Sequence, residues 1–95
     1  EEISGIPVSW PGETLDIGSR GQKVEQLQEQ LNAISNHYPL IPKIRADSIY
    51  GEETQRAVET FQGIFGLPET GEVDYRTWYK IQEIYVGVTR IAELY

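Results

Sequence analysis

The residues of this chain best suited to catalysis are carboxylates, and they gather beside two turn-like stretches. Asp47, Glu52 and Glu53 lie close together, and Asp74 follows the stretch Thr70–Glu72. Two carboxylates can cleave a glycosidic bond when a raised pKa keeps one of them protonated. That chemistry needs a deep cleft, which a chain of 95 residues has little material to build. We therefore expect a domain that is not an enzyme.

Other catalytic and metal-binding chemistry has little support in the sequence. His37 is the single histidine, and no second ligand stands at metal-binding spacing from it. The chain has no cysteine, which excludes disulfides and thiolate sites. No strained turn that would present a serine nucleophile is recognisable. We expect neither a metal nor a cofactor.

The composition is that of one small globular domain. With 39% hydrophobic and 24% charged residues, the chain is expected to fold around a single core. The net charge of -7 argues against a nucleic-acid partner, because such proteins present a basic surface to phosphates. No run of about 18 apolar residues predicts a membrane span. The first residues lack a signal-peptide pattern, and the absence of an initial Met suggests a segment of a longer protein.

The pattern of apolar residues predicts an all-α fold, a small three-helix bundle with an extended N-terminal arm and two turn motifs. Residues 1–17 contain glycines and prolines without helical periodicity and are expected to form the arm. Trp10 and Leu15 are its expected contacts with the body of the protein. Residues 18–95 are expected to form the helical domain.

Three segments have the apolar periodicity of helices. A capping-box pattern beginning at Ser19, whose hydroxyl would accept a backbone N–H, predicts the first helix over Gln22–Ser35. The second is predicted to begin at Glu52 and to stop at a following Gly and Pro. The third is predicted to follow Asp74 as its cap and to reach nearly to Tyr95.

The segment Asn36–Ala46 holds two prolines and is expected to be a rigid loop. Its apolar side chains are expected to fold back on the core, namely Tyr38, Leu40, Ile41 and Ile44.

One pattern occurs in both of the first two helices, where a glutamine directly follows a central core residue. The pairs are Leu27–Gln28 and Phe61–Gln62. At the edge of an apolar stripe, a glutamine amide can satisfy backbone groups of a nearby turn. We expect both glutamines to tie their helices to the turns, with a ligand contact as the alternative.

Three groups of residues follow one another in fixed order and spacing. They are Gly18-Ser19-x-Gly21-x-x-Val24-x-x-Leu27-Gln28-x-x-Leu31, Asp47-x-Ile49-Tyr50-Gly51-x-x-Thr54-x-x-Ala57-Val58-x-x-Phe61-Gln62, and Gly66-Leu67 with Thr70-Gly71-x-Val73-Asp74-x-x-Thr77-Trp78. Together these groups resemble the bacterial peptidoglycan-binding domain of the three-helix type, over about Pro11 to Ile81. The resemblance departs at Ser48, where the family usually has a glycine, and at Asp74, where it often has one.

The resemblance implies a noncatalytic site for cell-wall fragments, which carry N-acetylated sugars and a short peptide ending in a carboxylate. Such a ligand calls for aromatic faces, hydrogen-bonding groups and a cation. We expect the connecting turns to form a shared, shallow receptor. Its candidate residues are Asp47, Ser48, Tyr50, Gln62, Asp74, Tyr75, Arg76 and Trp78. The alternatives are structural: Asp47 as a turn former, Tyr50 and Trp78 as core, and Arg76 as a solvated charge.

The expected function is a module that targets an attached hydrolase or wall protein to peptidoglycan, either its glycan or its stem peptide. The resemblance also implies an extracellular, wall- or spore-associated location. A linked catalytic or repeat domain is the expected neighbour in the parent protein. Two alternatives stay open: an inhibitory or scaffolding segment that docks on an adjacent catalytic domain, and a packing unit without a ligand.

Overall fold

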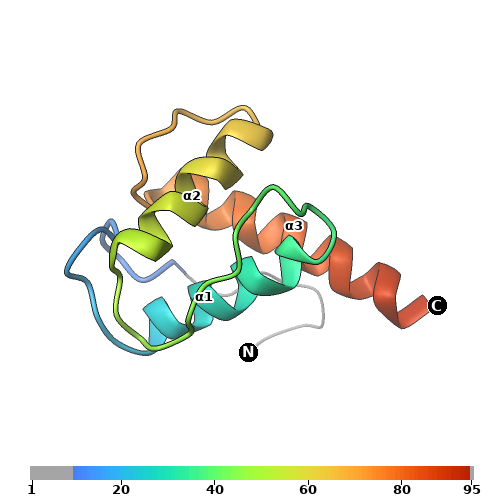
Figure 1. Ribbon diagram of the computed structural model, residues 1–95, viewed down its shortest axis with the longest axis horizontal. Coiled ribbons are helices and arrows are strands. Elements are labelled where there is room, and N and C mark those ends of the chain that lie inside the picture. Colours follow the sequence, from blue (N-terminus) through green and yellow to red (C-terminus); the bar gives the residue numbers. More distant parts are fainter. Residues whose placement is uncertain (1–9, 95) are drawn as a thin grey trace.

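Three helices form the frame of the computed structural model, which describes residues 10–94, with side chains described for residues 10–90 (Figure 1). They are α1 (Gln22–Ser35), α2 (Glu52–Ile64) and α3 (Tyr75–Leu94). Within residues 10–94 no strand forms, and the only β-type pairs are two isolated antiparallel bridges. The all-α prediction is confirmed. Residues 1–9 of the expected arm, and Tyr95, lie outside the described residues.

The start of α1 was predicted at the right residue but for the wrong reason. The N-cap is Gly21, with φ at 120°, and no side chain caps the helix. The Ser19 hydroxyl instead accepts the backbone N–H of Asp16 at 3.0 Å. Arg20 is held in a bridge with Ile49, which sets the backbone direction just before the helix. The capping-box prediction was wrong because the Ser19 hydroxyl bonds to Asp16 and the Ser19 carbonyl accepts the Tyr50 N–H at 2.9 Å, so neither is left for the helix.

The core lies where the three helices meet, with α1 packed along α3 (Figure 1). Its largest fully buried side chains are Trp78, Tyr50, Phe61, Leu27, Leu31 and Ile34. Burying one large apolar side chain contributes about 1.5–3 kcal/mol. Because Tyr50 and Trp78 stand next to the starts of α2 and α3, this core also fixes where those two helices begin.

The segment before α1 packs against the bundle, as predicted from Trp10 and Leu15. Leu15 is buried and exchanges two backbone hydrogen bonds with Val73, at 3.0 and 2.8 Å. Trp10 is half-buried, and its backbone N–H donates to the Tyr79 hydroxyl at 3.1 Å. The residues around Leu15 therefore close one side of the turn that leads into α3.

The loop between α1 and α2 folds back on the core, with one exception. Ile41 and Ile44 are buried, and the Ser35 hydroxyl donates to the Ile41 carbonyl at 2.6 Å. Leu40, predicted to do the same, is 79% exposed. The Ile41 N–H donates to the Tyr38 carbonyl at 3.0 Å, so Leu40 occupies the outer corner of a tight turn. The prediction for Leu40 was wrong because a hydrogen-bonded turn overrides its hydrophobicity.

Candidate functional site

Gln28 of α1 holds the turn that leads into α2. Its Nε2 donates to the Ile49 carbonyl at 2.9 Å and to the Thr54 hydroxyl at 3.0 Å. Its Oε1 accepts the backbone N–H of Ser48 at 3.0 Å. One buried amide thus satisfies a donor and an acceptor of the turn at once. The predicted tie between this glutamine and the turn is confirmed.

Ser48 adopts the left-handed conformation, with φ at 71°. The turn therefore keeps the geometry of the family's glycine although a serine stands there, at a cost of about 1–2 kcal/mol. Next to it, Asp47 Oδ1 accepts the Ile49 N–H at 3.0 Å. That hydrogen bond, helped by the Gln28 amide, lowers the pKa of Asp47 below its ordinary value. The Asp47 carboxylate is therefore engaged by its own turn.

Gln62 of α2 holds the turn that leads into α3 in the same manner. Its Nε2 donates to the Glu72 carbonyl at 2.9 Å and to the Thr77 hydroxyl at 3.1 Å. Its Oε1 accepts the Gly71 N–H at 2.9 Å, and Gly71 has φ at 76°. The side chain is 1% exposed, and both ends of its amide are bonded within the domain. This confirms the structural tie that was predicted for Gln62.

The two turns are structural repeats of one another. Ser48 and Gly71 are their left-handed residues, and each gives its N–H to a glutamine. Thr54 and Thr77 both stand in the first turn of the following helix, and each accepts from that glutamine. The repeat therefore includes the turn, the glutamine and the start of the helix.

Tyr50 joins the two repeats. Its side chain is 1% exposed, and its hydroxyl donates to the Gly71 carbonyl at 2.5 Å. Burial raises the pKa of the Tyr50 hydroxyl, so it stays a neutral donor at physiological pH. The ring therefore serves the core and the second turn, and its face is closed to solvent.

Asp74 caps α3, as predicted. Its Oδ1 accepts the Thr77 N–H at 2.9 Å, and the Trp78 N–H donates to the Asp74 carbonyl at 2.8 Å. A carboxylate at this position also complements the positive end of the helix dipole. Asp74 thus fixes the direction in which the first turn of α3 presents its side chains.

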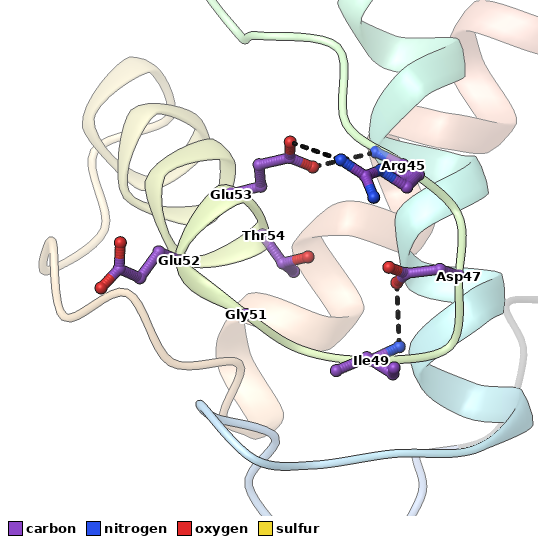
Figure 2. A pocket seen from close by; sticks show the side chains of 7 residues that line it. All are labelled: Arg45, Asp47, Ile49, Gly51, Glu52, Glu53 and Thr54. Carbon is purple, nitrogen blue, oxygen red and sulfur yellow. Dashed lines mark hydrogen bonds and ion pairs between the residues drawn. The ribbon is translucent and has the colours of Figure 1, made fainter.

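A shallow hollow of about 210 Å³ opens beside the first turn (Figure 2). Most of its charged groups are already paired, and Glu52 pairs with Arg56 outside the hollow. Figure 2 shows Arg45 opposite Glu53. The guanidinium and the carboxylate are 3.8 Å apart, and the backbone N–H of Arg45 donates to Glu53 Oε1 at 3.2 Å. Asp47 is turned toward the N–H of Ile49. This hollow therefore offers a ligand few groups that are not already engaged.

Two adjoining hollows lie at the start of α3. The smaller, about 100 Å³ and called the pit below, is lined among others by Gln62, Leu67, Thr70, Asp74, Arg76 and Thr77. The larger, about 340 Å³ and called the shelf, is lined by Leu67, Tyr75, Arg76, Tyr79, Lys80 and Glu83. Because Leu67 and Arg76 belong to both, the pit and the shelf form one continuous surface.

The shelf carries the most exposed aromatic side chain among residues 10–90. Tyr75 is 61% exposed. Its ring lies 4.8 Å from that of Tyr79 and 5.9 Å, edge to face, from that of Trp10. Such ring pairs contribute about 0.5–1.5 kcal/mol beyond the area they bury. Tyr75 is therefore a supported aromatic surface that remains open to a ligand.

The structure separates the eight candidate residues into three places. Four of them line the pit or the shelf, namely Gln62, Asp74, Tyr75 and Arg76. Asp47 lines the hollow of Figure 2, with Ser48 beside it in the same turn. Tyr50 and Trp78 are buried in the core. The hollows described here draw on one turn or the other, instead of the shared receptor that we expected.

Sequence reasoning missed the other lining residues of this surface, among them Leu67, Tyr79 and Lys80. Helical spacing offered a signal for the last two, since Tyr79 follows Tyr75 by four positions and Lys80 follows Arg76 by four. Leu67 had no such signal, because its place depends on how the chain leaves α2.

Across the described part of the chain, no group of three or more His, Cys, Asp or Glu residues is placed to hold a metal ion. None of the helices in that part combines the length and hydropathy needed to cross a bilayer.

Comparisons with known proteins agree with this architecture. Residues 20–81 match the sequence profile of the family described as "Putative peptidoglycan binding domain". The fold is similar to the crystal structure of the SleB N-terminal domain, with a TM-score of 0.69 and 25% sequence identity. That similarity covers 81% of this chain and 99% of the other. A search of curated proteins found no match.

Proposed function

The chain belongs to the family of peptidoglycan-binding domains, and from this premise we propose that it binds peptidoglycan without catalysis through the pit and the shelf. The exposed Tyr75 ring carries the proposal. Sugar rings present C–H faces that pack on aromatic side chains, and Tyr75 is held in place by Tyr79 and Trp10. Beside the ring, Arg76 offers the planar donor group that a carboxylate accepts.

The size of the site bears on how such a module would work. The pit and the shelf are small and open, so a single contact with the wall is expected to be weak. Linked to a hydrolase or another wall protein, the module would raise the local concentration of its partner and increase avidity by roughly 10² to 10⁴. We therefore propose targeting of an attached protein, at an extracellular site in the cell wall.

Pelleting with purified, insoluble peptidoglycan tests the proposal. The wild-type domain should sediment with the wall, and Tyr75→Ala should reduce the bound fraction several-fold. Leu40→Ala is the matched control, because it trims an exposed apolar side chain at 79% exposure far from the shelf in sequence. A wild-type domain that stays in the supernatant would exclude the function. Equal binding by Tyr75→Ala and wild type would exclude this site.

Deleting the segment from its parent protein separates targeting from the alternative of inhibitory docking. Targeting predicts that the deletion lowers activity on insoluble wall and leaves activity on soluble fragments unchanged. An increase in activity on both substrates would instead support docking on the catalytic domain.

A further inference from the structure

The first two turns of α3 present an aromatic pair beside a cationic pair on the shelf. Tyr75 and Tyr79 form the first, with ring centroids 4.8 Å apart. Arg76 and Lys80 form the second, each one position further along the helix. Residues four positions apart on a helix lie above one another, so the two pairs run side by side. A ligand on the shelf therefore meets apolar rings and positive charge together.

Among residues 10–90, the charges around the shelf leave Arg76 without an ion-pair partner. Lys80 Nζ lies 3.4 Å from Glu83 Oε1, so these two charges largely neutralise each other. The Asp74 carboxylate accepts the Thr77 N–H. Arg76 is exposed and forms no ion pair with any of the residues whose side chains the structure describes. An exposed guanidinium without an ion-pair partner can bind a carboxylate at short range, whereas the net charge of -7 opposes the approach of anions from a distance.

We infer that this surface binds the carboxylate-bearing stem peptide of peptidoglycan more tightly than the neutral acetylated glycan alone. The inference rests on the proposed function and names its ligand. The terminal carboxylate of the peptide accepts hydrogen bonds from the Arg76 guanidinium, and the adjoining alkyl groups pack on Tyr75. Leu67, shared by the pit and the shelf, completes the apolar wall.

A neutral glycan fits the shelf less well than a carboxylate, for a physical reason. A neutral sugar placed on the shelf would displace water from the Arg76 guanidinium without supplying a charged acceptor. A carboxylate replaces that water with charge-assisted hydrogen bonds, which are roughly twice as strong as neutral ones. The site is open to solvent, so this preference is moderate and should weaken with salt.

Titration of the folded domain with three probes, followed by NMR, tests the inference. The probes are a muramyl pentapeptide with a free terminal carboxylate, the same compound as its carboxamide, and a neutral tetramer of N-acetylglucosamine. We expect the free acid to bind about three- to tenfold more tightly than the amide. The neutral tetramer should bind more weakly than either. Equal affinity for acid and amide, or tightest binding of the tetramer, would overturn the inference.

Substitutions test which residues produce the preference for the acid over the amide. Arg76→Gln should abolish the difference between acid and amide, whereas Arg56→Gln removes the same charge from α2 and should leave the difference intact. Glu83→Gln has the opposite expected sign, because it frees Lys80 for the ligand and should strengthen binding of the acid. An acid preference that survives in Arg76→Gln would refute the role of Arg76.

A parallel measurement of binding to whole peptidoglycan distinguishes failure of the inference about the ligand from failure of the proposed function. If the wild-type domain pellets with the wall while the acid and amide bind equally, only the inference about the ligand fails. If the domain neither pellets nor responds to any probe, the proposed function itself fails.

Discussion

Replacing Gln62 with methionine should destabilise the domain well beyond the cost of an ordinary surface substitution. Methionine keeps most of the volume and removes both ends of the amide. The Gly71 N–H then loses its partner inside a buried turn, and the buried Thr77 hydroxyl loses its donor. The Glu72 carbonyl also loses a bond, but it belongs to an exposed residue and can turn to water.

The expected loss follows from those groups. A buried polar group without a partner costs about 1–3 kcal/mol, so two of them predict a loss of about 2–6 kcal/mol. For a domain of this size each kcal/mol lowers Tm by about 4–8 °C, so Tm should fall by at least about 8 °C. Since such domains have about 5–15 kcal/mol of stability, a loss in the lower half of this range leaves the variant folded at low temperature. Gln28→Met should cost less, because the Ser48 N–H that it leaves unpaired is only partly buried.

Urea unfolding followed by tryptophan fluorescence measures the effect, because Trp78 is fully buried in the native state. Gln26→Met is the matched control: Gln26 is half-buried on α1 and forms no side-chain hydrogen bond within the described residues. The midpoint should fall for Gln62→Met with the slope unchanged. A loss below about 0.5 kcal/mol, typical of a surface substitution, would refute the argument that the amide holds the turn.

The remaining predictions concern the left-handed residues and Tyr50. Ser48→Gly should stabilise the domain by about 0.5–1 kcal/mol, since relief of the left-handed strain outweighs the added freedom of the unfolded chain. Gly71→Ala should destabilise it by about 1–2 kcal/mol at the equivalent position, where the new Cβ would also lie 2.8 Å from Gln55 Cγ. Denaturant titrations should show opposite changes in the free energy of unfolding for the two variants. Changes of the same sign would contradict the structural equivalence of the two turns. Tyr50→Phe should cost about 1–3 kcal/mol through the lost bond to Gly71. Because the folded pKa of Tyr50 is raised, its contribution is complete below the unfolded value near 10 and falls as pH rises above it. Tyr50→Phe should therefore show a smaller loss of stability between about pH 10 and 12, and an unchanged alkaline decline would contradict this assignment.

Local signals in the sequence were sufficient to predict the helices and the two glutamine ties. The predicted bounds of α1 and the predicted start of α2 at Glu52 agree with the structure. Ser19 shows the limit of such signals: its capping pattern is local, whereas the Tyr50 N–H that bonds to the Ser19 carbonyl comes from a distant segment. No local pattern reports a contact of that kind.

The sequence predicted some of the residues of the site but did not predict how they are arranged. Tyr75 and Arg76 line the shelf as candidates, while Tyr50 is withdrawn into the core because its hydroxyl finds a buried acceptor. A buried amide pair between Gln30 and Gln82 was missed, with N–O distances of 3.0 and 2.7 Å. Gln82 directly follows a core residue, Ile81, as the two predicted glutamines do, so the same pattern could have revealed it.

The repeated glutamine ties also make the geometry of each turn independent of the length of the connection before it. Gln28 lies 19 residues before Asp47 in the first turn, whereas Gln62 lies only 8 before Thr70 in the second. Both turns nevertheless enter their helices in the same way. Closing a longer loop costs little extra free energy, so the segment before each turn can accommodate inserted residues. The loop around Leu40, with its exposed corner, is thus a natural place to graft a peptide for display.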